Sequence, residues 1–210
     1  MKLNYTNSLR ALPADSTILN KTLPSQYKIA FSNSRNNKGN DELNRNAADS
    51  RSRNKDLRQV IKSYLQGLSP RLSNNLIQPY WLSIQPILEQ LSNVQIIDEF
   101  VPNEEQCYKS KVGCVAQYKG IPHIIQWITA EEPKRDENYL YDKPLQLVAS
   151  VDAVNHYYSN SLFGSNIKHA LIVVALPNQE AQIFEFGCNQ LNRYRQTWQE
   201  RLKLFYKTAA

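Results

Sequence analysis

The segment "IIQWITAEEPK", residues 124–134, decides how the rest of the chain is interpreted. Its first half is short, apolar and rich in β-branched and aromatic residues, which is typical of a buried strand. Its second half is charged and contains Pro133, so the strand is expected to end in a polar turn. The sequence therefore predicts a strand over residues 122–129 with a charged turn directly behind it.

Two further strands are predicted immediately before this one. The segments "VQIIDEFV" (94–101) and "KVGCVAQYKG" (111–120) are short, rich in β-branched and aromatic residues, and separated by polar residues. The sequence "YKGIP" (118–122) then joins the second of them to the strand at 122–129. Gly120 in so short a connection is typical of a tight hairpin.

Helical periodicity occurs on both sides of these three strands. Apolar residues at spacings of three and four predict helices, and Gly67 and Pro86 are expected to end the first and to kink the second. Continuous or alternating apolar runs predict two more strands near the end of the chain. The predicted helices cover residues 53–67, 79–91, 143–159 and 191–205, and the added strands cover 168–176 and 181–187. This order predicts an α/β or α+β fold with a central mixed sheet flanked by helices.

The amino-terminal part of the chain differs in composition from the rest. Residues 1–71 contain 13 Lys and Arg against five Asp and Glu, whereas residues 72–210 contain 12 against 14. Residues 14–53 are rich in Asn, Ser, Lys and Arg and lack apolar periodicity, so we expect residues 1–53 to be a basic, mostly flexible arm before a domain at 54–210. Such a segment either attracts nucleic acid by releasing counterions or is an ordinary solvated surface.

Several classes of protein are disfavoured by the composition. No apolar run is long enough for a membrane span, and Met1–Leu12 does not resemble a secretory signal. We therefore expect a soluble intracellular protein of a reducing compartment, either the cytoplasm or an organelle interior. Neither a nucleotide-binding glycine loop nor a zinc motif is recognisable, so a small-molecule substrate and a structural metal are not expected. The three cysteines, Cys107, Cys114 and Cys188, are odd in number and show no C-x-x-C spacing. This argues against a disulfide framework and is the reason for expecting a reducing compartment.

The run "GCVAQYKGIPHIIQWITAEEPK", followed by "YDKPLQLVASVDAVN" and "ALIVVA", resembles a known family of nucleases. It is similar to the RecB-like branch of the PD-(D/E)XK superfamily, in particular to the mitochondrial genome maintenance exonucleases. The resemblance is most specific over about residues 94–207 and looser over 51–207. It implies a restriction-endonuclease-like core and a metal-dependent DNA exonuclease ancestry.

The resemblance also implies which positions would carry catalysis, and this sequence departs from the family at most of them. The two metal-binding Asp positions fall on Gly113 and Gln126, and the catalytic Lys falls on Ile128. An upstream His position falls on Arg58. The motif Gln is retained as Gln146, and an acid of the first strand is retained as Asp98 or Glu99.

These replacements matter because cleavage of a phosphodiester in this family needs paired carboxylates that hold Mg²⁺ and a Lys that positions water. A glycine, an amide and an isoleucine supply none of these groups, so we expect a pseudonuclease with no bound cofactor. The alternative is an active metal-dependent single-strand exonuclease whose metal ligands have migrated, with Glu131, Glu132 or Glu104 as replacements; only then is Mg²⁺ expected.

Two non-catalytic functions remain open at this point. The protein either binds single-stranded nucleic acid or serves as an accessory or scaffold subunit of a larger complex. For the first function, the basic front segment and the family positions predict a set of binding residues: Arg51, Arg53, Lys55, Arg58, Lys62, Thr129, Lys134 and Gln146.

Overall fold

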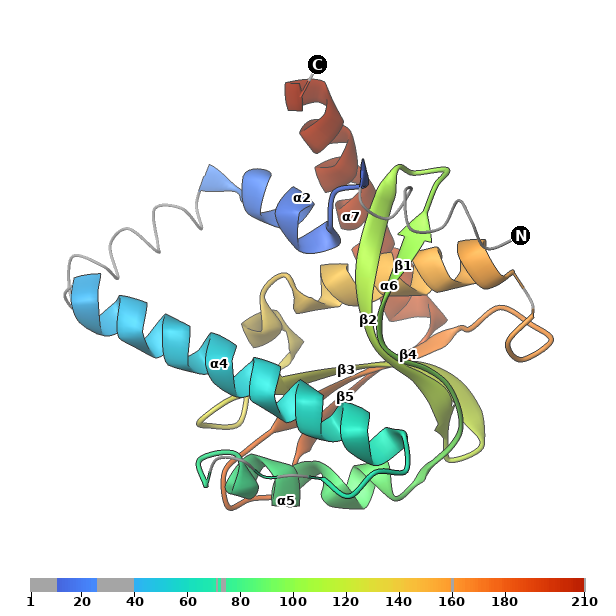
Figure 1. Cartoon of the computed structure of the whole chain (residues 1–210). Coiled ribbons are helices and arrows are strands. Elements are labelled where there is room, and N and C mark those ends of the chain that lie inside the picture. The colour runs from blue at the N-terminus through green and yellow to red at the C-terminus, as the bar shows by residue number, and fades with distance from the viewer. Residues whose placement is uncertain (1–10, 26–39, 71, 73–74, 160, 210) are drawn as a thin grey trace.

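The computed structural model shows an α+β fold built on one mixed five-stranded sheet (Figure 1). The strands follow one another across the sheet in chain order, β1-β2-β3-β4-β5. Pairing is antiparallel except between β3 and β4, which are parallel. This mixed sheet with flanking helices confirms the predicted fold class. The structure describes residues 11–25, 40–70, 72, 75–159 and 161–209.

All five predicted strands are present. Their bounds are Leu91–Asn103 for β1, Tyr108–Tyr118 for β2, Ile121–Thr129 for β3, His169–Ala175 for β4 and Gln182–Phe186 for β5. The predicted hairpin between β2 and β3 is confirmed as well, because Lys119 and Gly120 both have positive φ, 51° and 79°. Two successive positive φ values belong to the type I′ turn, whose twist matches that of the flanking strands.

The helices cover both faces of the sheet. Each of the four predicted helices is present, and α5 ends three residues earlier than predicted because Leu91 already begins β1. The long helices are α4 (Asn40–Leu65), α6 (Lys143–Tyr158) and α7 (Cys188–Ala209). The shorter ones are α2 (Asp15–Lys21), α5 (Gln78–Leu88) and the 3-10 helix η1 (Glu137–Leu140). Among the described helices, none combines the length and apolar character that crossing a bilayer requires.

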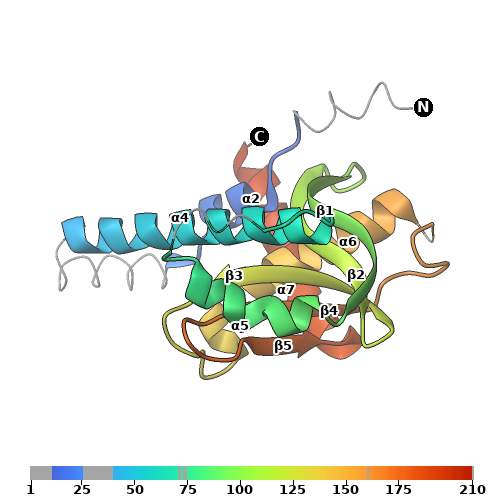
Figure 2. The same ribbon diagram turned by 60° about the horizontal axis from the view of Figure 1, so that its bottom comes forward.

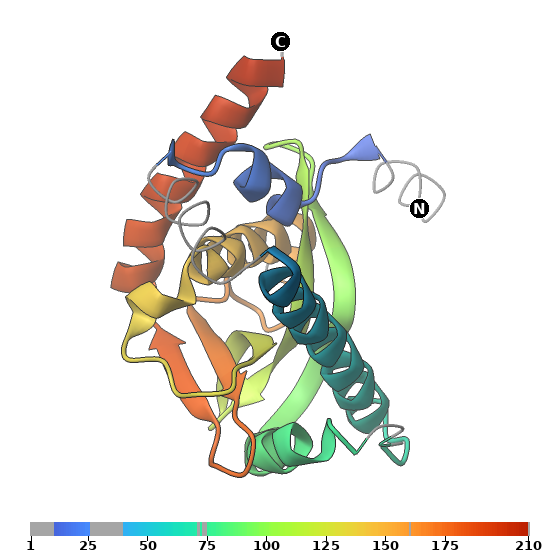
Figure 3. The same cartoon turned by 90° about the vertical axis from the view of Figure 1, so that its left-hand side faces the viewer.

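Two apolar clusters, one on each face of the sheet, form the core. Figures 2 and 3 show how the helices that contribute to these clusters are arranged around the sheet. Strand β4 contributes to both, because alternate side chains of a strand point to opposite faces. Ile172 and Val174 pack with α2, α6 and α7, whereas Leu171 and Val173 pack with α4 and α5. The parallel β3–β4 pair, with α6 as its crossover, is thus covered on both sides.

The parts of the predicted flexible arm, residues 1–53, that the structure describes contain helical segments. Residues 15–21 form α2, in which Ile18 and Leu19 are fully buried in the core cluster of α6 and α7. Helix α4 begins at Asn40 rather than near residue 53, and its first turns extend past the sheet in Figure 2. Residues 1–10 and 26–39, the rest of the predicted arm, lie outside the described residues.

Candidate functional site

A cleft of about 430 Å³ lies where α2, α4 and α6 approach strands β1, β2 and β3. The structure brings together in this cleft the positions that the family resemblance singled out and that are far apart in sequence. It is lined by Asp15, Ser16, Arg58, Asp98, Phe100, Lys111, Gly113, Gln126, Trp127, Ile128, Lys143 and Gln146. Of the two first-strand acids, Asp98 lines the cleft, whereas its exposed neighbour Glu99 does not.

Gly113 occupies a place in β2 where no side chain fits. A Cβ at this position would lie 2.6 Å from the carbonyl oxygen of Ile125 and 3.3 Å from Cδ1 of Trp127. Backbone oxygen atoms cannot yield as a flexible side chain can, so β2 and β3 would have to separate. The approach of the two strands is therefore adapted to glycine, and an aspartate at this position requires a different local backbone.

The side-chain amide of Gln126 is held in place by a hydrogen bond within the protein. Its Nε2 donates to Oγ of Ser150 over 3.1 Å, and Ser150 in turn lies 2.8 Å from Oγ of Ser110. The Ser110 hydroxyl is 2.5 Å from Oδ2 of Asp15, and Ser150 also donates to the carbonyl oxygen of Gln146. A series of hydrogen-bonded polar groups thus connects Gln126 to the carboxyl group of Asp15 in α2.

Asp15 is the most deeply buried ionisable group of the cleft. Only 3% of the residue is exposed, and its other oxygen accepts from the backbone N–H of Ser16. Burial raises the pKa of Asp15 to about 6, against the lowering effects of the Ser110 hydroxyl and of the Lys143 charge. Burial likewise lowers the pKa of Lys143, whose ammonium donates to Oε1 of Gln146 over 3.0 Å.

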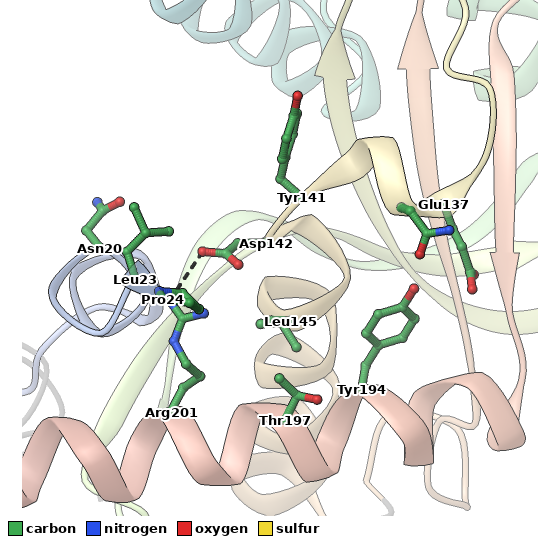
Figure 4. Close-up of a pocket in the computed structure, with 11 residues that line it drawn as sticks. Asn20, Leu23, Pro24, Glu137, Tyr141, Asp142, Leu145, Tyr194, Thr197 and Arg201 are labelled. Atoms are coloured by element: carbon green, nitrogen blue, oxygen red, sulfur yellow. Dashed lines mark hydrogen bonds and ion pairs between the residues drawn. The ribbon is translucent and has the colours of Figure 1, made fainter. Parts of the chain in front are cut away.

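Arg201 of α7 fixes α2, and thereby Asp15, in this position. Its Nε donates to Oγ1 of Thr22 over 2.7 Å and its Nη2 to the carbonyl oxygen of Leu19 over 2.5 Å. Figure 4 shows the remaining contact, in which Nη2 lies 3.4 Å from Oδ2 of Asp142 beside a second cavity of about 440 Å³. The buried guanidinium therefore links α2, α7 and the start of α6.

The electrostatic balance of the cleft is set by three cations and two acids. Arg58 comes from α4, Lys143 from the first turn of α6, and Lys111 from β2. Lys111 is 3.1 Å from Oδ2 of Asp98 and also donates to the Asp98 carbonyl oxygen over 2.7 Å. The excess of cations over carboxylates makes the cleft suited to an anionic ligand.

The residues of the cleft do not fit the Mg²⁺ that the family resemblance implies for an active enzyme. Asp15 is buried among hydroxyl and N–H donors, and Asp98 is paired with Lys111. The side chains of Gly113 and Ile128 offer no ligand atom, and no cluster of three or more His, Cys, Asp or Glu occurs in the described ranges of the chain. A hard divalent cation needs several oxygen ligands, preferably carboxylates that carry no competing cation.

The proposed migrated ligands lie elsewhere. Glu131 and Glu132 line a separate cavity of about 610 Å³ at the end of β3, which we call the Thr129 cavity. Glu104 is exposed at the turn between β1 and β2. The remaining lining residues of the Thr129 cavity are Ser50, Arg53, Thr129, Ala130 and Lys134.

Five of the eight predicted nucleic-acid-binding residues line one of these two cavities. Arg58 and Gln146 line the cleft, and Arg53, Thr129 and Lys134 line the Thr129 cavity. Arg51, Lys55 and Lys62 also lie on α4 but line neither cavity. Helix α4 therefore borders both cavities, with Arg53 at the Thr129 cavity and Arg58 at the cleft.

Several lining residues of the cleft were not singled out from the sequence, among them Asp15, Phe100 and Lys111. Asp15 lies in a segment without apolar periodicity, so nothing local pointed to a site. Phe100, 39% exposed, and Lys111 are partners across the β1–β2 ladder, with the ammonium 5.1 Å from the ring centroid. The alternation of β2 places Lys111 and Gly113 on the same face, which was a usable signal.

Comparison with known proteins supports a relation to exonucleases. The chain is similar to proteins named mitochondrial genome maintenance exonuclease 1 from Mus musculus, with 36% identity over 125 residues, and from Homo sapiens, with 35% over 117. These matches cover 59% and 56% of this chain. The Xenopus tropicalis protein of the same name is 33% identical over 96 residues, 46% of this chain.

The chain spans about a third of the length of the curated relatives it matches, 36%, 33% and 27% in the same order. No protein-family model matches the chain. The similarity thus supports an exonuclease-like family for the matched part of the chain.

Proposed function

We propose that this protein is a catalytically degenerate relative of a single-strand exonuclease and acts by binding single-stranded nucleic acid. The observation that carries the proposal is the composition of the cleft. Gly113, Gln126 and Ile128 stand together where the resembled nucleases need Asp, Asp and Lys, while the cations Arg58, Lys111 and Lys143 line the same space. Loss of carboxylates removes both the metal ligands and their repulsion of phosphates.

Hydrolysis is disfavoured by the same geometry. Each missing group would have stabilised charge in the transition state, and such groups typically contribute several orders of magnitude to the rate. The Gln126 amide is engaged with Ser150, and the two remaining acids are engaged with other donors. Binding without cleavage is therefore the function that the cleft supports best.

The names of the relatives agree with nucleic acid as the partner, because those proteins are named as exonucleases of genome maintenance. Their names also refer to mitochondria, and for this chain an organelle interior or the cytoplasm stays a prediction. A role as an accessory or scaffold subunit stays an alternative function to be separated by experiment.

The test combines cleavage and binding. End-labelled single-stranded DNA is incubated with the protein in Mg²⁺ or Mn²⁺, and binding of the same oligonucleotide is measured by fluorescence anisotropy at several salt concentrations. We expect no cleavage, and affinity that falls steeply as salt increases. Cleavage that a chelator abolishes would make the protein an active exonuclease, with Asp15 and Asp98 as the first residues to replace.

A restored variant serves as the positive control for the fold assignment. Gln126→Asp combined with Ile128→Lys returns two of the three family groups, and Gly113 is left unchanged because a side chain there collides with β3. Absence of any binding, by the natural protein and by this variant, would leave the scaffold function.

A further inference from the structure

The Thr129 cavity contains hydrogen-bond donors that no described residue satisfies. Thr129 is only 9% exposed, and its Oγ1 has no partner among the described atoms. The Nε of Arg53 is likewise buried and without a hydrogen-bond acceptor. Buried polar groups are almost always paired, so two unpaired donors in residues that line one cavity indicate a ligand that supplies acceptor oxygens.

One wall of this cavity is fixed by a hydrogen bond between α4 and β3. Oδ1 of Asn54 accepts from the backbone N–H of Thr129 over 2.9 Å, and Nδ2 of Asn54 donates to the carbonyl oxygen of Ser50 over 2.7 Å. The turn behind β3 is held by Gln182, which exchanges two hydrogen bonds with the backbone of Lys134. The donors are therefore preorganised by the fold.

An acidic side chain from the same turn already approaches the cationic wall. Oε1 of Glu131 lies 2.6 Å from Nη2 of Arg53, and Oε2 accepts from the hydroxyl of Tyr80 over 3.0 Å. The Arg53 guanidinium also lies over the Tyr80 ring, 5.8 Å from its centroid. The side chain of Glu131 is 61% exposed, against 24% for Arg53. A carboxylate so exposed is held weakly and can be displaced.

We propose that the Thr129 cavity is a phosphate-binding subsite for a nucleic-acid backbone, and that Glu131 is an internal anion which the phosphate displaces from Arg53. The inference rests on the proposed function and adds a second anchoring point outside the cleft. Arg53 offers a planar set of donors suited to phosphate oxygens, Thr129 adds a hydroxyl, and Lys134 adds positive charge at the rim. Glu131 thereby lowers the affinity of the resting protein.

The proposal predicts an increase in affinity when an ion pair is removed. In the full chain, Glu131→Gln is expected to tighten binding of a labelled oligothymidylate about fivefold, measured by fluorescence anisotropy at one fixed salt concentration. Glu132→Gln is the matched control, because it removes the same charge from the lining of the same cavity without the contact to Arg53. We expect it to change affinity less than twofold.

Two further variants test the donors. Arg53→Gln is expected to weaken binding about tenfold and to reduce the salt dependence by about one released ion. Thr129→Val, which keeps the shape of the side chain, is expected to weaken binding about threefold. In the Arg53→Gln background, Glu131→Gln should no longer increase affinity, since the two residues act through one contact.

The outcomes separate the subsite from the proposed function. If the natural protein binds DNA but Glu131→Gln behaves like Glu132→Gln, or Thr129→Val has no effect, the subsite is wrong and the proposed function stands. If neither the natural protein nor Glu131→Gln binds the oligonucleotide, both proposals are wrong. An unchanged effect of Glu131→Gln in the Arg53→Gln background would also overturn the subsite.

Discussion

The cleft and the Thr129 cavity are both bordered by helix α4 and strand β3, but their carboxylates differ in burial. In the cleft, Asp15 is buried and closes a hydrogen-bonded chain through Ser110 to Gln126. In the Thr129 cavity, Glu131 is exposed at the rim while the hydroxyl of Thr129 has no partner. The difference teaches that burial and hydrogen bonding fix one carboxylate within the fold, whereas an exposed carboxylate beside unpaired donors can give way to a ligand.

The largest effect that would sharpen this comparison is the pH dependence of stability. Burial raises the pKa of Asp15 from its usual 3.8 to about 6, so the native state keeps the proton that the unfolded chain releases. The stabilising contribution of the protonated form is therefore complete below about pH 4 and is lost as the pH rises through 6. Integrated over that interval, the loss amounts to about 3 kcal/mol.

Asp15→Asn isolates this contribution. We expect the variant to match the natural protein near pH 4 and to be more stable by up to about 3 kcal/mol at pH 8. Urea unfolding at a series of pH values measures the difference. Parallel curves for the two proteins would show that Asp15 is not held in a buried environment, and the contrast with Glu131 would lose its basis.

The next effect concerns the close approach of β2 and β3 at Gly113. Gly113→Ala places a Cβ 2.6 Å from the Ile125 carbonyl oxygen, and we expect it to lower the free energy of unfolding by about 2 kcal/mol. Gly187→Ala is the control, because a Cβ there meets only Oε1 of Gln190 at 3.6 Å. Equal effects of the two substitutions, measured by urea denaturation, would contradict the close approach of β2 and β3.

The next prediction compares the Ser150 hydroxyl, which has hydrogen-bond partners, with the Thr129 hydroxyl, which has none among the described atoms. Ser150→Ala leaves the Gln126 amide without its acceptor and removes one of the two partners of Ser110, which keeps Asp15, and it is expected to cost about 1–2 kcal/mol. Thr129→Val removes a hydroxyl that has no partner among the described atoms, and we expect no loss of stability and a gain of up to about 1 kcal/mol. Differential scanning calorimetry of both variants tests this, and a destabilised Thr129→Val would break the comparison.

The smallest effect is on binding in the cleft. Arg58→Gln removes one lining cation, and we expect single-stranded DNA affinity to fall about fivefold, or about 1 kcal/mol, uniformly across sequences. Arg51→Gln is the control, since Arg51 is exposed on the same helix and lines neither cavity. An equal loss in both variants would indicate that general charge, rather than the cleft, attracts the nucleic acid.

The fold was predictable where local patterns and packing agree. Apolar runs and alternation marked all five strands, and Lys119 and Gly120 form the expected hairpin. The start of α4 was not predictable from its apolar pattern, because its first half is polar and a helix can extend a turn at a time from a packed nucleus. Helix α2 was missed because only Ile18 and Leu19 of its seven residues pack into the core.

The sequence by itself determined the order of the elements and the excess of positive charge at the front. It also places Gly113, Gln126 and Ile128 at the positions where the family resemblance implies two acids and a lysine. Only the tertiary structure decided that Asp15, remote in sequence, reaches the cleft and that Glu131 lies outside it. The physical reason is that burial and pairing depend on which elements pack together, and local patterns do not specify those contacts.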